Sequence, residues 1–508
     1  MILFMKKICL LLFIFLFLGC NNDTPKTIIH VIVINNVSYN LTEEAFDCLS
    51  SYLEYLEEYY SNEEKSEEII NVLSTKIAEK LSQKLNSEED AVNQKELESI
   101  IEGIKQEGKI DGIPDAPAIP GVDDIGSSTI TILAYLVANN NLDDDLLANI
   151  GAMYDGLAEM DQQATLLVYW DGKTKIGSNK AQHLILKYVT DGKGNINGLP
   201  ALDMNATLND VLDEAEIVKE YETQYSVDKA IMSKVLKDMV ALAPSSKLGL
   251  IFGSHASSWL NSIYTSRAFG QDGSGDDTML IPDMVEAISS TNEKYEFVLF
   301  DACYMGTAEV AYAFRNVCDY QISSVMEVPA YGFPYEDFMK YLYKGDVENY
   351  KSVCKSFVDF YQNAYSNGNT AWATVSLIDS KEVGNLVNEI KKEIVEHKDA
   401  LANYDVNVLQ EYGRTAGPYI AYDLEQLISD LNGGNVPATF GSQMLKTVLY
   451  KNSLEKARPA SYAVDAANYC GMGIYIPVEK RPKWNEYFKT LDWYTASGWS
   501  EVTFSWNS

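Results

Sequence analysis

The chain has 508 residues, enough for two or three domains, and 46% of them are hydrophobic, which excludes a disordered chain. Its formal net charge of −33 excludes nucleic acid as a partner, because a phosphate backbone would be repelled. The charge favours cationic peptides or ions as ligands, or reflects only a solvated acidic surface, and both interpretations remain open.

The first residues have the pattern of an export signal. Lys6 and Lys7 precede an apolar run of about a dozen residues, too short for a stable membrane span. A Gly–Cys pair at 19 and 20 ends the run and resembles the lipobox of bacterial lipoproteins, in which the cysteine is acylated. We therefore expect residues 1–20 to be a lipoprotein signal peptide and Cys20 to carry lipid that attaches the protein to a membrane. The expected location is the cell envelope, at the outer membrane or cell surface, with a plain secretory signal as the alternative.

Cys9 lies within the signal segment with Cys20. The five other cysteines are scattered and odd in number, at positions 48, 303, 318, 354 and 470. Their spacing fits neither a disulfide framework nor a CxxC zinc site. At least one thiol is therefore expected to stay reduced.

Residues 21–110 predict a small α+β module. The stretch IIHVIVINNVSYNL at 28–41 alternates apolar residues around Asn35 and Asn36, as a β-hairpin does. Three amphipathic helices follow, with apolar stripes at 46–60, 70–85 and 97–104. The module weakly resembles the segment that precedes phage-shock-protein-C-type domains. It has no catalytic residue types, so packing or partner binding is its expected role.

Residues 111–128 are rich in proline and glycine and predict a linker. Beyond it, from 129 to 508, the pattern changes to that of an α/β domain. Near-continuous apolar strands are expected at 129–138, 164–172, 247–254 and 295–302, with helices at 143–160 and 281–290. This alternation predicts a mostly parallel sheet with helices on both faces, and a site beyond the carboxyl ends of its strands.

Two side chains with complementary chemistry follow two of these strands. His255 follows the strand at 247–254, and Cys303 follows the strand at 295–302. A right-handed crossover would set both on one rim of the sheet. There a thiolate attacks a carbonyl while an imidazole transfers the proton, and a helix expected to begin near Met305 favours the thiolate. The backbone N–H groups of Ala256 and Cys303 are candidates to hold the oxyanion, whereas a purely packing role for the cysteine is the alternative.

The stretches GSHASSWL and FDACYMGTAEVAY, which carry these residues, resemble the clostripain family of cysteine peptidases, relatives of caspases, gingipains and legumains. The family pattern is His-Gly-x-x-Trp after one apolar strand and Asp-Ala-Cys-x-Met-Gly-x-x-Glu after the next. The segments at 270–288, 323–335, 421–431 and 471–477 also resemble family segments, so the resemblance spans 129–506.

This resemblance implies a caspase-like domain and a catalytic dyad of His255 and Cys303. It implies that Asp301 lines the pocket for the P1 side chain and selects Arg or Lys, and a buried carboxylate beside the nucleophile suits a cation. Capping of the following helix is the alternative role for Asp301. Glu327 is a further candidate to border the same cleft.

Three other matching positions, Met305, Gly306 and Glu309, are expected to be structural, with Gly306 serving close packing. One position departs from the family, because Ala256 stands where the family has glycine. An alanine amide donates equally well, but a positive φ there would strain the turn and weaken the oxyanion hole. Loss of catalysis therefore remains an open alternative.

Family members can be activated by self-cleavage after a basic residue between the histidine and the cysteine. Arg267 is the candidate, because it lies in a polar, glycine-rich stretch, whereas Lys294 directly precedes a core strand. The acidic residues Asp272, Asp276 and Asp277 lack EF-hand spacing, so a solvated loop is expected there rather than a metal site. No cofactor is expected, and calcium dependence stays open.

The sequence thus predicts a lipid-anchored cysteine endopeptidase that cleaves protein or peptide substrates after Arg or Lys. One alternative is a catalytically degenerate envelope lipoprotein of the same fold that binds peptides or protein partners. Another is a structural anchor whose function resides in the N-terminal module.

Overall fold

The computed structural model describes residues 130–507 except 178–180, 203–205, 246, 261–268, 274–277 and 414–418. Within the first hundred residues it describes 29–34, 37–42 and isolated positions between 45 and 100. The chain divides into two compact units, Met1–Ser127 and Ser128–Ser508. The signal peptide and the linker predicted from the sequence lie outside the described residues.

The first unit contains the predicted hairpin. Strand β1 (Ile29–Ile34) pairs antiparallel with β2 (Val37–Thr42), and the register ends with Ile34 opposite Val37. A short strand β3 (Ala91–Val92), which the sequence did not indicate, adds to β2 in parallel. The apolar stripes of all three predicted helices contribute buried side chains: Leu49, Ile77, Leu81, Leu97 and Ile100.

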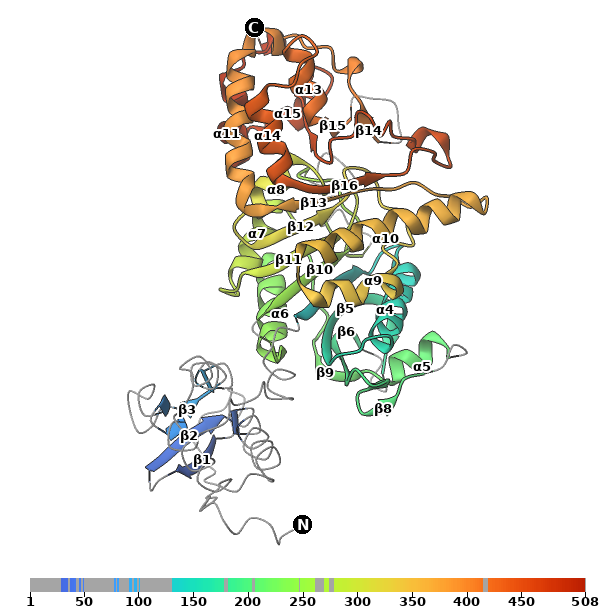
Figure 1. Ribbon diagram of the computed structural model, residues 1–508, viewed down its shortest axis with the longest axis vertical. Coiled ribbons are helices and arrows are strands. Elements are labelled where there is room, and N and C mark those ends of the chain that lie inside the picture. Colours follow the sequence, from blue (N-terminus) through green and yellow to red (C-terminus); the bar gives the residue numbers. More distant parts are fainter. Residues whose placement is uncertain are drawn as a thin grey trace, which may run out of the picture. The chain divides into compact units, whose positions relative to one another are not determined.

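The second unit is built on one large mixed sheet (Figure 1). Its strands are β4 (Thr131–Ala138), β5 (Ala164–Ile176), β6 (Ala181–Thr190), β7 (Asn195–Ile196), β8 (Leu199–Pro200), β9 (Glu216–Glu220), β10 (Leu248–Gly253), β11 (Tyr295–Asp301), β12 (Cys318–Ser323), β13 (Thr374–Asp379) and β16 (Val448–Ser453). The central strands run parallel in the spatial order β12, β11, β10, β4, β5. Antiparallel strands extend both sides, β13 and β16 beyond β12, and β6 to β9 beyond β5. The prediction of a mostly parallel sheet is confirmed.

Helices cover both faces of this sheet. They include α4 (Asp143–Ala158), α6 (Lys229–Leu242), α7 (Ile281–Ser289), α8 (Ala308–Phe314), α9 (Tyr335–Lys344), α10 (Val347–Ser366) and α11 (Ser380–Glu396). Successive strand residues face opposite sides, so Ile132 packs in the core with α4, α9 and α10, and Leu133 in the core with α6, α7 and α8. Because the central strands are buried on both faces, they are continuously apolar. Figure 1 shows α4, α9 and α10 across one face.

The C-terminal part adds a small antiparallel sheet and further helices. The strands are β14 (Glu411–Tyr412), β15 (Ala421–Asp423) and β17 (Gly473–Ile474), with β15 between the other two. The helices of this part are α12 (Lys398–Leu401), α13 (Leu424–Leu431), α14 (Ala438–Thr447), α15 (Pro482–Phe488) and α16 (Asp492–Ala496), whereas α5 (Leu208–Asp213) lies earlier in the chain, between β8 and β9. A bridge between Thr307 and Gly473 joins the small sheet to the segment that follows Cys303.

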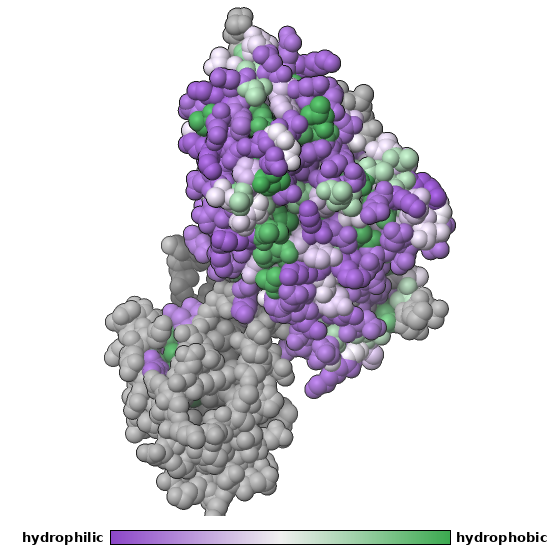
Figure 2. All heavy atoms as spheres, turned by 45° about the horizontal axis from the view of Figure 1, so that its top comes forward, coloured by the Kyte–Doolittle hydropathy of each residue, from purple (hydrophilic) through white to green (hydrophobic). Residues whose placement is uncertain are grey.

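The surface of the second unit is largely hydrophilic on the face seen in Figure 2, with small separate hydrophobic areas. Within the described part of the chain, no helix combines the length and apolar character needed to cross a membrane.

The strand register brings three connections to one edge of the sheet. Gly253 at the end of β10 lies opposite Asp301 of β11 and opposite Leu136 of β4. Because these strands are parallel, the segments that follow them leave the sheet side by side. The three segments are 139–142, 254–256 and 302–304.

The helix expected to begin near Met305 begins later, because α8 starts at Ala308 after its N-cap residue Thr307. The intervening turn instead makes backbone hydrogen bonds to another segment. Tyr304, at a φ of 62°, donates to the Met326 carbonyl at 2.9 Å, and Gly306 donates to the Ser324 carbonyl at 2.7 Å. These long-range partners hold the turn in a non-helical conformation, so no helix begins directly after the cysteine.

Gly306 makes the close backbone approach that the sequence predicted, which gives a test of stability. A Cβ at Gly306 would lie 2.7 Å from the Ser324 carbonyl carbon and the Val325 nitrogen. Gly306→Ala should therefore destabilise the fold by about 1–3 kcal/mol in urea unfolding. Gly384→Ala is the control, because nothing lies within 4 Å of its Cβ in α11, and it should stabilise by up to about 1 kcal/mol. Equal midpoints for the two variants would contradict the close approach.

Candidate active site

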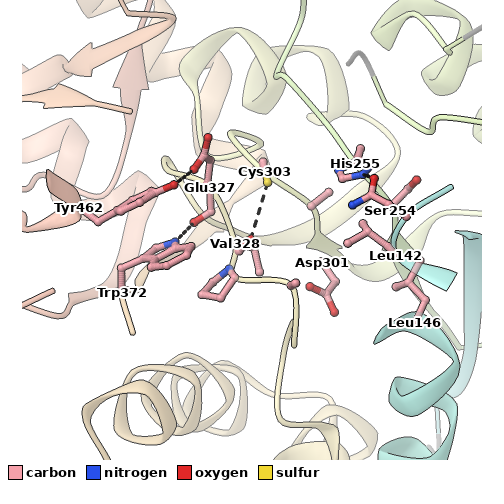
Figure 3. A pocket seen from close by; sticks show the side chains of 14 residues that line it. Leu142, Leu146, Ser254, His255, Asp301, Cys303, Glu327, Val328, Trp372 and Tyr462 are labelled. Carbon is pink, nitrogen blue, oxygen red and sulfur yellow. Dashed lines mark hydrogen bonds between the residues drawn. The ribbon is translucent and has the colours of Figure 1, made fainter. Parts of the chain in front are cut away.

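A cleft of about 230 Å³ opens at the edge where the three connections meet (Figure 3). It is lined by side chains from six separate segments: Asn141, Leu142 and Leu146; Ser254 and His255; Asp301, Ala302 and Cys303; Glu327, Val328, Pro329 and Ala330; Trp372; and Tyr462. The cleft thus contains His255, Cys303 and Asp301, which the sequence predicted to lie together, and Glu327.

Cys303 is the cysteine that reaches this cleft. It is half-buried, two residues beyond the end of β11, and its Sγ lies 3.8 Å from the Val328 carbonyl oxygen. Cys318, Cys354 and Cys470 are instead fully buried, and burial raises the pKa of each thiol, to about 12 for Cys318. These three remain protonated packing residues at neutral pH.

His255 occupies the equivalent place on the neighbouring strand. It lies two residues beyond Gly253, as Cys303 lies two residues beyond Asp301, and Gly253 and Asp301 pair directly. The turn is fixed by Ser254, whose hydroxyl donates to the Val137 carbonyl at 2.7 Å, and by Gly270, whose amide donates to the His255 carbonyl at 2.9 Å. These two contacts fix the backbone of the turn from which the His255 side chain reaches the cleft.

Asn141 contacts the imidazole directly and was not identified from the sequence. Its Oδ1 lies 2.8 Å from His255 Nε2, so that nitrogen donates and carries the proton. The signal was present in the run Asn139–Asn140–Asn141 directly after an apolar parallel strand, where polar side chains collect in such sheets.

Ala256 has an ordinary backbone conformation. Among described non-glycine residues, positive φ occurs at Asn197, Ser258, Asn292 and Tyr304, and not at Ala256. The strain considered for an alanine in place of the family glycine is therefore absent. No described residue accepts a hydrogen bond from the Ala256 amide.

Asp301 is buried and held by neutral donors. Its Oδ2 accepts hydrogen bonds from the Tyr335 hydroxyl at 2.9 Å, the Phe333 amide at 3.2 Å and Asn149 Nδ2 at 3.3 Å. Burial raises the pKa of this carboxyl to about 6, although the hydrogen bonds from Phe333 and Tyr335 oppose the rise. No cationic side chain of the described residues pairs with it. The helix-capping alternative is wrong, since Asp301 bonds to the 333–335 segment and not to α8.

A glycine makes this approach to Asp301 possible. Gly332 has a φ of 76°, and a Cβ there would lie 2.5 Å from Asp301 Oδ2. Both the backbone conformation and the contact therefore exclude a larger residue.

Two aromatic side chains border the cleft on the side of Cys303 away from His255 and Asp301, together with Glu327 (Figure 3). Trp372 and Tyr462 stack with their ring centroids 4.1 Å apart. Glu327 bonds to both, because its carbonyl accepts from Trp372 Nε1 at 2.9 Å and its carboxylate accepts from the Tyr462 hydroxyl. The sequence offered no signal for the two rings, which lie outside the motifs.

The other matching motif residues are structural, as expected. Met305 and Glu309 are buried, and Glu309 Oε1 accepts from the Tyr475 amide at 2.9 Å. Burial raises the pKa of Glu309 to about 7.

The remaining predicted residues lie away from the cleft or outside the described part of the chain. Arg267 and Cys20 fall outside the described residues, as do Asp276 and Asp277. The prediction that Asp272 lies in a solvated loop is wrong, because its side chain is buried. Its carboxylate accepts hydrogen bonds from the Ser226 amide at 2.8 Å and from Asn139 Nδ2 at 3.0 Å. Within the described ranges, no group of three or more His, Cys, Asp or Glu side chains could hold a metal ion.

Known proteins share both this sequence pattern and this fold. Residues 134–506 match the clostripain family. An inactive zymogen C11 protease from Parabacteroides distasonis is similar in structure, with a TM-score of 0.58 at 25% identity, covering 73% of this chain and 98% of that one. A secreted C11 cysteine protease from Bacteroides thetaiotaomicron, in complex with an irreversible peptide inhibitor, has the same TM-score and identity and covers 74% and 100%. No curated protein matches. The family match covers most of the chain and includes the strands that carry this cleft. The chain therefore belongs to the clostripain family of C11 cysteine peptidases.

Proposed function

We propose that this peptidase is an endopeptidase that cleaves after arginine or lysine, with Cys303 as the nucleophile and His255 as its acid–base partner. The observation that carries the proposal is the shared cleft. In it a half-buried thiol and an imidazole follow paired strand ends, next to a buried carboxylate that no described cation neutralises.

The reaction follows from these groups. The Cys303 thiolate attacks the scissile carbonyl, while His255 holds the thiol proton and then gives it to the leaving amine. Water, deprotonated by the imidazole, afterwards releases the acyl group from the sulfur. The amides of Ala256 and Cys303 are the candidates to hold the oxyanion, and the ordinary backbone of Ala256 supports this role. The same backbone conformation counts against the alternative of a degenerate site, which was argued from strain at Ala256.

Asp301 supports selectivity for a cationic P1 side chain. Its three donors are neutral, so the carboxylate retains its charge near neutral pH in a buried position. A guanidinium or ammonium group entering the cleft would pair with it out of water, where a charge pair is strong. A neutral side chain would leave the carboxylate buried without a counter-ion.

The location and processing of the protein are further parts of the proposal. The signal pattern supports attachment to the cell envelope through lipid on Cys20, and the similar Bacteroides thetaiotaomicron protease is described as secreted. Cleavage after Arg267 is proposed to activate the chain, and the similar Parabacteroides distasonis protease is described as an inactive zymogen. Arg267 falls between Leu260 and Phe269, which are both buried.

The central test is a fluorogenic peptide assay with Arg, Lys, citrulline, Asp or Leu at P1, using purified protein. Wild type should cleave after Arg and Lys, and Cys303→Ala should abolish turnover. Asp301→Asn should lower kcat/KM for the Arg peptide by about 100-fold while changing the citrulline peptide far less, because only the charge pair is lost. No turnover in folded protein, with or without calcium, would instead favour the peptide-binding alternative.

Mass spectrometry of the same protein, isolated from cells, tests the two finer parts. A diacylated Cys20 as the new N-terminus is expected, as is a second chain that begins at Ala268. Intact chains in an active preparation would remove the processing proposal, and an unmodified N-terminus beyond Cys20 would remove the lipid anchor.

The pKa of Asp301 predicts a pH dependence. Its carboxyl is protonated as the pH falls through about 6, and the protonated form cannot pair with arginine. The kcat/KM for the Arg peptide should therefore fall by about tenfold for each pH unit below that value. The rate of Cys303 alkylation by neutral iodoacetamide serves as the control, because it reports the dyad alone. A constant ratio of the two rates between pH 5 and 7 would refute this role of Asp301.

Asn141 is proposed as a positioning residue for His255. Asn141→Ala should lower kcat by roughly 10- to 100-fold with little change in KM, because the imidazole loses the partner that fixes its tautomer. Asn141→Asp keeps an acceptor oxygen, so it should recover activity. Its negative charge favours the protonated imidazole of His255, so the acid limb of the kcat–pH profile should shift to higher pH. Asn435→Ala, at an exposed asparagine outside the cleft, is the matched control. An unchanged pH profile in Asn141→Asp would indicate a merely structural role.

A further inference from the structure

We propose that Trp372 and Tyr462 form an aromatic platform that binds the substrate side chain directly before the scissile P1 residue, at P2, and favours phenylalanine or tyrosine there. The inference rests on the proposed cleavage after Arg or Lys and adds a second selectivity determinant to the same cleft.

The platform is a stack of two rings at the border of the cleft. Its rings are nearly parallel, with an interplanar angle of 10° and centroids 4.1 Å apart. Tyr462 is buried, whereas Trp372 is half-exposed, so the indole is the accessible surface and the phenol ring supports it from behind. Both rings line the cleft that contains Cys303.

The platform is rigid, because each ring is held at its polar atom by the same residue. Trp372 Nε1 donates to the Glu327 carbonyl, and the Tyr462 hydroxyl donates to the Glu327 carboxylate. The chain segments are joined as well, since Ala371 and Arg458 exchange two backbone hydrogen bonds of 3.0 and 2.8 Å. A surface that is ordered before binding loses little conformational entropy when a side chain stacks on it.

The direction of the substrate places P2 on this platform. His255 must face the leaving amine in order to protonate it, so the acyl part of the substrate extends from Cys303 away from His255. Figure 3 shows Trp372 and Tyr462 on that side of Cys303, whereas Asp301 lies on the His255 side. With the P1 side chain directed to Asp301, the next side chain towards the substrate N-terminus reaches the indole.

The chemistry of the platform selects for aromatic side chains. Stacked aromatic pairs gain attraction beyond the burial of apolar area. A single methylene in an apolar pocket already discriminates by about 10- to 200-fold, so a ring is expected to discriminate at least tenfold. Leucine should therefore rank below phenylalanine and tyrosine, and glycine last.

The experiment measures kcat/KM for coumarin peptides with Arg at P1 and Phe, Tyr, Leu or Gly at P2. Wild type should prefer Phe over Gly by about tenfold or more. Trp372→Ala should reduce that ratio to about one, and Trp372→Phe, which keeps a ring, should retain most of it. Tyr225→Ala removes an exposed aromatic side chain, 64% accessible and outside the cleft, and should leave every ratio unchanged.

The outcomes separate this inference from the proposed function. Cleavage after Arg with no P2 preference in wild type would overturn the platform, as would an equal loss on all P2 substrates in Trp372→Phe. The wild-type series and Trp372→Phe decide the question even if Trp372→Ala does not fold. Absence of cleavage after both Arg and Lys would instead refute the proposed function.

Discussion

The parallel register between β10 and β11 is the constraint on which the site depends. Gly253 lies opposite Asp301, so both chains leave the sheet at the same level, and His255 and Cys303 follow at equal distance. A slip of one residue would turn the side chains of one strand to the other face and separate the pair. The register is fixed by packing, because alternate residues such as Leu250 and Ile251 are buried in separate cores on the two faces.

Burial of a charge is the second organising feature of the cleft. The Asp301 side chain is buried, and burial alone would favour the neutral, protonated carboxyl. Three neutral donors from α4 and the 333–335 segment offset part of this cost. What remains is a buried carboxylate that is ionised near neutral pH and has no cationic partner among the described residues, as the proposed pairing with a basic P1 side chain requires.

Much of the fold was predictable, and so was the meeting of His255, Asp301 and Cys303 in one cleft, because their signals are local. His255 and Cys303 each follow a continuous apolar strand, so a parallel sheet is enough to bring the two side chains to one edge. The predicted start of α8 was wrong, because the carbonyls of Ser324 and Met326, in another segment, accept hydrogen bonds from the turn that precedes the helix. Asn141, Trp372 and Tyr462 reach the cleft through contacts distant in sequence. Periodicity carries no information about such contacts, and Asp272 was placed in solvent for the same reason.

The donors around Asp301 also limit which side chains position 301 can carry. An apolar residue at 301 would leave the Phe333 amide and the Tyr335 hydroxyl buried without an acceptor, at a cost of about 1–3 kcal/mol each. Gly332 packs closely against this carboxylate, and its own backbone conformation resists substitution. A change of the proposed P1 selectivity through residue 301 must therefore rebuild the 332–335 segment as well. The half-exposed indole of Trp372, in contrast, is open to stepwise change.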